Sequence, residues 1–130
     1  MTCAVVIREA IRRAAIDPGL VDESFMGCVV PNGMGQAPAR QAAIHGGVPP
    51  EIGAVTLNKV CGSGLKTVML AAALIRAGDG DVYLAGGMEN MSLTPYMLPQ
   101  ARSGYRLGNG QLIDSVVHDG LWSSFTGKHM

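Results

Sequence analysis

"LNKVCGSGLKTVMLAAALI", residues 57–75, contains the junction that decides the fold. A strand-like run ends at Val60 and a long apolar run follows, so Cys61 lies where we expect a strand to give way to a helix. The unpaired amides of a helix N-terminus favour an anion, and a cysteine reacts as its thiolate. Gly62 and Gly64 have no Cβ and leave room beside the sulfur. The stretch therefore suits covalent acyl transfer, with the Cys61 N–H as an oxyanion donor.

A structural role fits the same residue types. Cysteine is among the residues most often buried, and Cys3 and Cys28 each fall inside an apolar run where we expect them to be core residues. For Cys61 the residue types alone leave both interpretations open. The three cysteines form no C-x-x-C pair and have no histidines at zinc spacing, so we expect no metal site and a reducing, cytoplasmic location.

Strand and helix patterns alternate on both sides of this junction. Apolar residues recur with helical spacing in some segments, and β-branched residues cluster in others. We expect helices over 4–15, 38–46 and 63–77, and buried strands over 25–30, 54–60 and 81–85. This alternation predicts an α/β fold with a mostly parallel sheet and right-handed crossovers.

The residue composition and periodicity change after residue 88. Prolines and glycines recur through 89–110 without a sustained period, which predicts a long functional loop. Residues 111–122 have room for one short helix.

Composition excludes several classes of partner. Ten basic residues balance ten acidic ones, with no run of like charge, so neither a nucleic-acid surface nor an anionic-membrane patch is indicated. The longest strongly apolar stretch, 67–75, is far shorter than the roughly 20 residues that cross a bilayer. We therefore expect a small-molecule partner, no nucleic acid and no membrane.

Five stretches together resemble the thiolase family. The stretch around Cys61 is similar to the acyl-enzyme signature of that family, in which Asn precedes the cysteine and a Gly-Ser-Gly turn and an apolar helix follow it. The other stretches agree with the family in the same order along nearly the whole chain: "PARQAA" (38–43), "AGGMENMS" (85–92), "DGL" (119–121) and "HM" (129–130).

The resemblance implies a fold and a domain organisation. Thiolases consist of two α/β halves in a layered αβαβα body, with a loop domain over the active site. Residues 1–88 then resemble an incomplete N-terminal α/β domain. Residues 89–130 resemble the beginning of the loop domain, which covers the CoA and acyl groups and pairs dimers into tetramers. A homo-oligomer, either dimer or tetramer, is the expected state of the full-length protein.

The resemblance also implies an activity and its residues. Thiolases transfer acyl groups between coenzyme A and a carbon nucleophile, here expected to be acetyl-CoA and acetoacetyl-CoA, with CoA thioesters as substrates and no bound cofactor. Cys61 matches the cysteine that carries the acyl group as a thioester. Leu121, His129 and Met130 match loop-domain residues near the acyl and pantetheine pocket.

Two further residues in the matching stretches invite a catalytic role. Arg40 in "PARQ" is better explained as structural, because an isolated buried arginine is normally paired with backbone or carboxylate. Glu89 in "GGMENMS" is better explained as support for the glycine turn than as a general base.

Three interpretations of function remain from the sequence. The Gly-His-Pro and Cys-x-Gly motifs of the family are absent from residues 1–130, and His45, His118 and His129 do not match its activating histidine. We therefore expect the N-terminal portion of a thiolase, with negligible turnover by itself. The alternatives are a truncated, non-catalytic protein that binds CoA or a partner subunit, and a condensing enzyme of fatty-acid or polyketide synthesis. The "PARQ" and "GGMENMS" stretches argue against the condensing enzyme.

Overall fold

The computed structural model describes residues 2–130, except for the side chain of Thr2. The chain divides into two compact units. The first comprises Met1–Val29 and Met34–Glu89, and the second comprises Val30–Gly33 and Asn90–Met130. The short segment 30–33 thus belongs to the second unit, although elements of the first unit flank it in the sequence.

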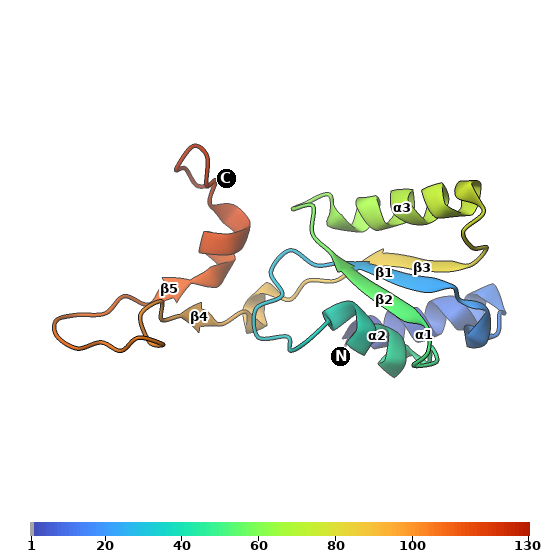
Figure 1. Ribbon diagram of the computed structural model, residues 1–130, viewed down its shortest axis with the longest axis horizontal. Coiled ribbons are helices and arrows are strands. Elements are labelled where there is room, and N and C mark those ends of the chain that lie inside the picture. Colours follow the sequence, from blue (N-terminus) through green and yellow to red (C-terminus); the bar gives the residue numbers. More distant parts are fainter. Residues whose placement is uncertain (1) are drawn as a thin grey trace. The chain divides into compact units, whose positions relative to one another are not determined.

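A three-stranded parallel sheet forms the centre of the first unit (Figure 1). Strands β1 (Glu23–Gly27), β2 (Gly53–Leu57) and β3 (Tyr83–Gly87) lie in the order β2-β1-β3. Phe25 in the middle of β1 is in register with Val55 on β2 and Ala85 on β3. The predicted α/β class and parallel sheet are confirmed.

Three helices pack on this sheet, one before β1, one between β1 and β2, and one between β2 and β3. They are α1 (Thr2–Ala14), α2 (Pro38–Gly46) and α3 (Ser63–Ala77). The last two have the predicted bounds, because their end signals are local. A proline opens α2, and glycines in the left-handed conformation end both helices, Gly47 at φ 100° and Gly78 at φ 75°.

Helices α1 and α2 cover one face of the sheet (Figure 1). The apolar stripe of α1 packs on α2 and on the strands beneath, as its helical spacing predicts. The buried residues of this cluster are Ile7, Ile11, Met26, Ala39, Ala42, Ala43 and Val48. The core of the unit is therefore on the α1/α2 side.

Helix α3 covers the opposite face and approaches the sheet closely. Its contact face consists of small residues, Ser63, Thr67 and Ala71, all buried. The Thr67 hydroxyl donates to Gly64 O at 2.6 Å or to Gly86 O at 3.0 Å, so it is satisfied although fully buried. Small side chains on α3 let the helix lie directly on the strands.

The outer side of α3 is apolar and exposed. Leu65 is 69% exposed, and Val68, Met69 and Ile75 are also exposed. By length and composition alone, Val60–Ala77 is apolar enough to cross a membrane. The helix itself has 15 residues, which span about 22 Å at 1.5 Å per residue, and it packs on the sheet as a layer of the α/β unit.

The strands differ from the predictions in their bounds and burial. Strands were expected over 25–30, 54–60 and 81–85, whereas all three pair over one common five-residue register. The hydrogen-bonded pairing of the three strands sets these limits, and the sequence of a single segment does not reveal them. Only β1 is central, so β2 and β3 are half-exposed edge strands rather than buried ones.

The second unit contains little regular structure, in keeping with the predicted loop. Strands β4 (Tyr96–Met97) and β5 (Ile113–Asp114) pair antiparallel, and the short helix expected within 111–122 is η3 (Val117–Leu121). The Ser115 hydroxyl, fully buried, donates to the Pro95 carbonyl and ties the two strands together. A turn, η2 (Met91–Leu93), precedes them.

Candidate functional site

Cys61 lies in the turn between β2 and α3, as the sequence predicts. β2 ends at Leu57 and α3 begins at Ser63, so the cysteine precedes the helix by two residues. Its side chain is exposed and its thiol is in no disulfide. The arrangement presents a cysteine to solvent beside the N-terminus of a 15-residue helix.

The backbone immediately before Cys61 adopts a rare conformation. Val60 has φ 48°, in the left-handed region that β-branched residues seldom occupy. Such a conformation costs about 1–3 kcal/mol and persists only where its surroundings hold it in place. Nothing in the residue types at 57–64 predicts it, because valine has no preference for this region.

Two side chains hold this turn. The Asn58 Nδ2 donates to Val29 O at 3.0 Å, and its Oδ1 accepts the Val60 N–H at 2.9 Å. The Ser63 hydroxyl accepts the Lys59 N–H at 2.8 Å and donates to Val60 O at 2.5 Å. The backbone N–H of Val60 is therefore hydrogen-bonded by a residue before it in the chain, and its C=O by a residue after it.

The glycines near the cysteine serve different purposes. A Cβ added at Gly62 would meet nothing closer than Lys59 O at 3.5 Å, an ordinary contact, so the space beside Cys61 is open there. A Cβ at Gly27 would lie 2.6 Å from the Ser63 carbonyl carbon. Gly27, which sequence reasoning missed, is thus the glycine that allows α3 to sit on the sheet.

Arg40 and Glu89 both have structural contacts. The Arg40 guanidinium donates to Pro50 O at 2.9 Å, which confirms the expected tie to the backbone, although Arg40 is exposed rather than buried as that expectation assumed. The Glu89 carboxylate accepts the Val29 N–H at 2.9 Å, across 60 positions of sequence. Glu89 thereby fastens the end of β3 to the segment that follows β1.

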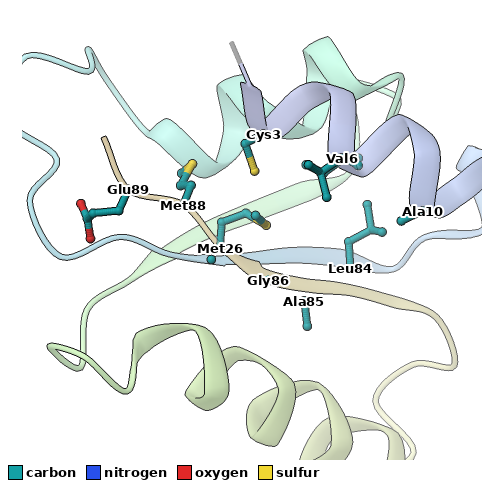
Figure 2. Close-up of a pocket in the computed structure, with 11 residues that line it drawn as sticks. Cys3, Val6, Ala10, Met26, Leu84, Ala85, Gly86, Met88 and Glu89 are labelled. Atoms are coloured by element: carbon teal, nitrogen blue, oxygen red, sulfur yellow. The ribbon is translucent and has the colours of Figure 1, made fainter. Parts of the chain in front are cut away.

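A cavity of about 350 Å³ lies between α1 and β3 in the first unit. Figure 2 shows that Cys3, Val6, Met26 and Leu84 face this space, with the carboxylate of Glu89 turned away from it. Burial raises the pKa of the Cys3 thiol. The cavity is apolar, its cysteine is Cys3, and Cys61 is not among its lining residues.

The other predicted site residues lie in the second unit, and the structure brings them together. Met130 N donates to Leu121 O at 2.9 Å, and His129 pairs with Trp122 in an antiparallel bridge. The His129 Nδ1 lies 2.6 Å from Met130 O. Leu121 is half-buried, whereas His129 and Met130 are exposed. The three form one local cluster, and Cys61 belongs to the first unit.

One polar cluster of the second unit was not anticipated. The Asp119 carboxylate accepts from Asn32 Nδ2 at 2.8 Å and lies 2.6 Å from His118 Nδ1. The hydrogen bond with His118, and to a lesser extent that with Asn32, lowers the pKa of Asp119 against the opposing effect of burial. Asn32 and Asp119 are 87 positions apart, so no local pattern could have paired them.

The comparison with protein families decides the ancestry of this chain. A family model described as "Thiolase, N-terminal domain" matches residues 2–130. This chain belongs to the thiolase family. The stretch around Cys61 and the clusters described above therefore lie within a thiolase N-terminal domain, as the resemblance in the sequence predicted.

Several curated bacterial proteins are similar to this thiolase chain. It is 54% identical over 127 residues to an "acetyl-CoA acetyltransferase" of Pseudomonas aeruginosa and 55% identical over 128 residues to one of Escherichia coli. A "probable acetyl-CoA acyltransferase" of Staphylococcus epidermidis is 49% identical. Each match covers 98% of this chain but 32% of the relative, so the chain spans about a third of the length of these proteins.

The part of the chain that the structure describes contains no candidate metal-binding site. Among residues 2–130, no three His, Cys, Asp or Glu side chains gather where they could hold a metal ion.

Proposed function

We propose that this protein transfers acyl groups between coenzyme A and a carbon nucleophile, with acetyl-CoA and acetoacetyl-CoA as substrates and Cys61 as the acyl carrier. The observation that carries the proposal is an exposed cysteine at a strained strand-to-helix turn within a thiolase N-terminal domain. The names of the bacterial relatives support the substrate class.

The proposed chemistry has two half-reactions. The Cys61 thiolate attacks the carbonyl carbon of the acyl-CoA, a C–S bond forms, and the carbonyl electrons move onto oxygen. Collapse of this oxyanion expels the CoA thiolate, which takes up the proton that the Cys61 thiol lost. In the synthetic direction a second acetyl-CoA gives up an α-proton to a base, and its α-carbon attacks the acyl-cysteine, which breaks the C–S bond and releases the Cys61 thiolate. In the degradative direction Cys61 attacks the 3-oxo carbon of acetoacetyl-CoA, the C2–C3 bond breaks, the departing acetyl-CoA takes up a proton, and the CoA thiolate then displaces Cys61 from the acyl group. A shared acyl-cysteine predicts ping-pong kinetics.

The N–H of Cys61 is the proposed oxyanion donor. In the same turn the Gly62 N–H donates to Lys59 O at 3.1 Å and the Ser63 N–H donates to Val60 O at 3.0 Å. An N–H that faces the substrate oxygen stabilises the charge that develops there. Among the described residues of the first unit, no histidine or carboxylate hydrogen-bonds the Cys61 thiol, so the proposed mechanism takes its general base from other residues.

Leu121, His129 and Met130 are the proposed contacts for the acyl and pantetheine groups. Their support is that Met130 N and Leu121 O hydrogen-bond each other, which makes the three residues one local surface. Half-buried Leu121 and exposed His129 offer an apolar and a polar contact, as a pantetheine chain requires.

Oligomerisation and location belong to the same proposal. The loop of the second unit carries exposed apolar residues, with Leu93 at 78% and Leu107 at 99% exposure, which supports pairing of subunits through this loop into a dimer or tetramer. We propose a cytoplasmic protein that works without a bound cofactor.

A second candidate function is non-catalytic. The exposed apolar side of α3 and the two edge strands favour a chain that binds CoA or another polypeptide without turning over substrate. The two candidates differ in one respect, since only the enzyme forms a covalent acyl-cysteine.

Acetyl transfer to Cys61 tests the first candidate against the second. The natural gene product that carries this sequence is incubated with radiolabelled acetyl-CoA, and its peptides are mapped by mass spectrometry. We expect label on Cys61, none on a Cys61→Ala variant, and normal labelling of a Cys3→Ala variant. Label that survives Cys61→Ala would contradict the proposal. An acyl carrier protein thioester serves as the alternative donor, and preferential labelling by it would indicate a condensing enzyme.

A further inference from the structure

The carbonyl of Val60 and the N–H of Cys61 belong to one peptide group. That group is planar and trans, as no cis peptide bond occurs among the described residues. In a trans peptide the C=O and the N–H point in opposite directions. Whatever holds the Val60 carbonyl therefore also sets the direction of the Cys61 N–H.

Ser63 holds this carbonyl twice. Its hydroxyl donates to Val60 O at 2.5 Å and its backbone N–H donates to the same oxygen at 3.0 Å. The Ser63 side chain is 3% exposed and lies against β1, where a Cβ at Gly27 would meet the Ser63 Cβ at 2.7 Å. A side chain packed this tightly cannot change rotamer freely, so its hydroxyl is a fixed anchor.

Asn58 holds the other side of Val60. It accepts the Val60 N–H at 2.9 Å and is itself fixed by its bond to Val29 O at 3.0 Å. Val60 is thus kept at φ 48° by bonds to its N–H and to its C=O. The N–H of Cys61 then points opposite to the Val60 carbonyl, away from buried Ser63.

We infer that Ser63 and Asn58 are positioning residues that aim the Cys61 N–H at the developing oxyanion, by locking the peptide between Val60 and Cys61. The inference rests on the proposed function of Cys61. Neither residue takes part in the covalent chemistry. Each is expected to affect one step, the attack on a thioester carbonyl.

Two reagents separate aiming of the N–H from general support of the turn. Acetyl-CoA reacts through an oxyanion, whereas iodoacetamide alkylates a thiolate by displacement at a saturated carbon and needs no oxyanion donor. A residue that only supports the turn would affect both reactions alike. A residue that aims the N–H affects the first reaction selectively.

The test compares Ser63→Ala with Thr67→Val in the natural gene product. Both changes remove a buried hydroxyl of α3 that donates to backbone carbonyls, but Thr67 makes no bond to the Val60 peptide. Complete loss of one oxyanion donor lowers the rate about 100-fold or more. Ser63→Ala keeps the hydrogen bond from the Ser63 N–H to Val60 O, so we expect a smaller effect, with acetylation of Cys61 slower by about tenfold. Alkylation by iodoacetamide should stay within about twofold of wild type, since thiolate reactivity is retained.

Each result decides the inference. Equal acetylation rates in Ser63→Ala and Thr67→Val would overturn it while leaving Cys61 as the acyl carrier. Equal slowing of acetylation and alkylation in Ser63→Ala would also overturn it, because the role would be structural. A wild-type protein that is never acetylated at Cys61 would overturn the proposed function as well. Asn58→Ala provides a second variant, expected to show the same selective loss should Ser63→Ala fold poorly.

Discussion

Gly27 on β1 and Ser63 on α3 are in direct backbone contact, with no room for a Cβ at Gly27. The missing Cβ would lie 2.6 Å from the Ser63 carbonyl carbon, well inside the distance that real Cβ atoms keep. This contact sets how closely α3 lies on the sheet and therefore where the Cys61 turn stands.

Replacing Gly27 by alanine should push α3 away from β1. Overpacking of this kind costs about 1–3 kcal/mol, so we expect the free energy of unfolding of Gly27→Ala to fall by that amount in urea titrations. Gly62→Ala is the matched control, because a Cβ there makes only a 3.5 Å contact. Equal stability of the two variants would contradict this account of the contact.

Ser24 carries a buried hydroxyl without a partner. It is fully buried on β1, and its Oγ has no hydrogen-bond partner among the described residues. Removing an unsatisfied buried polar group is favourable, so Ser24→Ala should raise the free energy of unfolding by about 0.5–1 kcal/mol. Thr67→Val, which removes a satisfied hydroxyl, should lower it. A destabilised Ser24→Ala would show that the hydroxyl has a partner after all.

Asp22 makes the first unit sensitive to acid. Hydrogen bonds from the N–H groups of Val82 and Asp81 lower the pKa of Asp22 from its ordinary value of 3.8. A carboxyl with a lowered pKa in the folded state stabilises the fold above its unfolded pKa, and this contribution is lost as the pH falls through the folded pKa. Stability should therefore decline below about pH 4, and less steeply in Asp22→Asn. Thermal unfolding between neutral and acidic pH measures the slope, and identical slopes would refute the assignment.

The three cysteines should differ in reactivity by exposure. Cys61 is exposed, Cys3 is partly buried with a raised pKa, and Cys28 is 1% exposed. Because alkylation needs an accessible thiolate, we expect iodoacetamide to modify Cys61 first, Cys3 more slowly and Cys28 only on unfolding. Peptide mapping at successive times provides the order. Modification of Cys28 ahead of Cys61 in the folded protein would contradict the structure.

The exposed apolar side of α3 should make the 130-residue chain self-associate. Leu65 and Met69 are 69% and 51% exposed, and large apolar patches of this kind drive association. Leu65→Glu combined with Met69→Lys should lower the sedimenting mass of the chain and leave its circular dichroism unchanged. Thr67→Lys, on the packed side of the same helix, should unfold it instead. Unchanged association in the double variant would place the contact elsewhere.

The sequence predicts those features that depend on neighbouring residues. Helices 38–46 and 63–77 end where proline and glycine signals lie, and Cys61 is at the predicted turn because two local patterns meet there. Features that depend on distant residues were not predictable. β3 is half-exposed because it has a neighbouring strand on one side only. The hydrogen bond between Asn32 and Asp119 joins positions that are 87 residues apart in the sequence. The left-handed Val60 was missed for a third reason, since its surroundings impose a conformation that its own side chain disfavours.

The Val60 turn has a consequence for the order of assembly. Its bonds reach Val29 after β1, Asn58 after β2 and Ser63 on α3, so three separate parts of the chain must already be in place before the costly backbone state can persist. A nascent or partly folded chain therefore cannot hold Val60 in the left-handed conformation. The turn that carries Cys61 is completed late in folding, after the strands and α3 have come together.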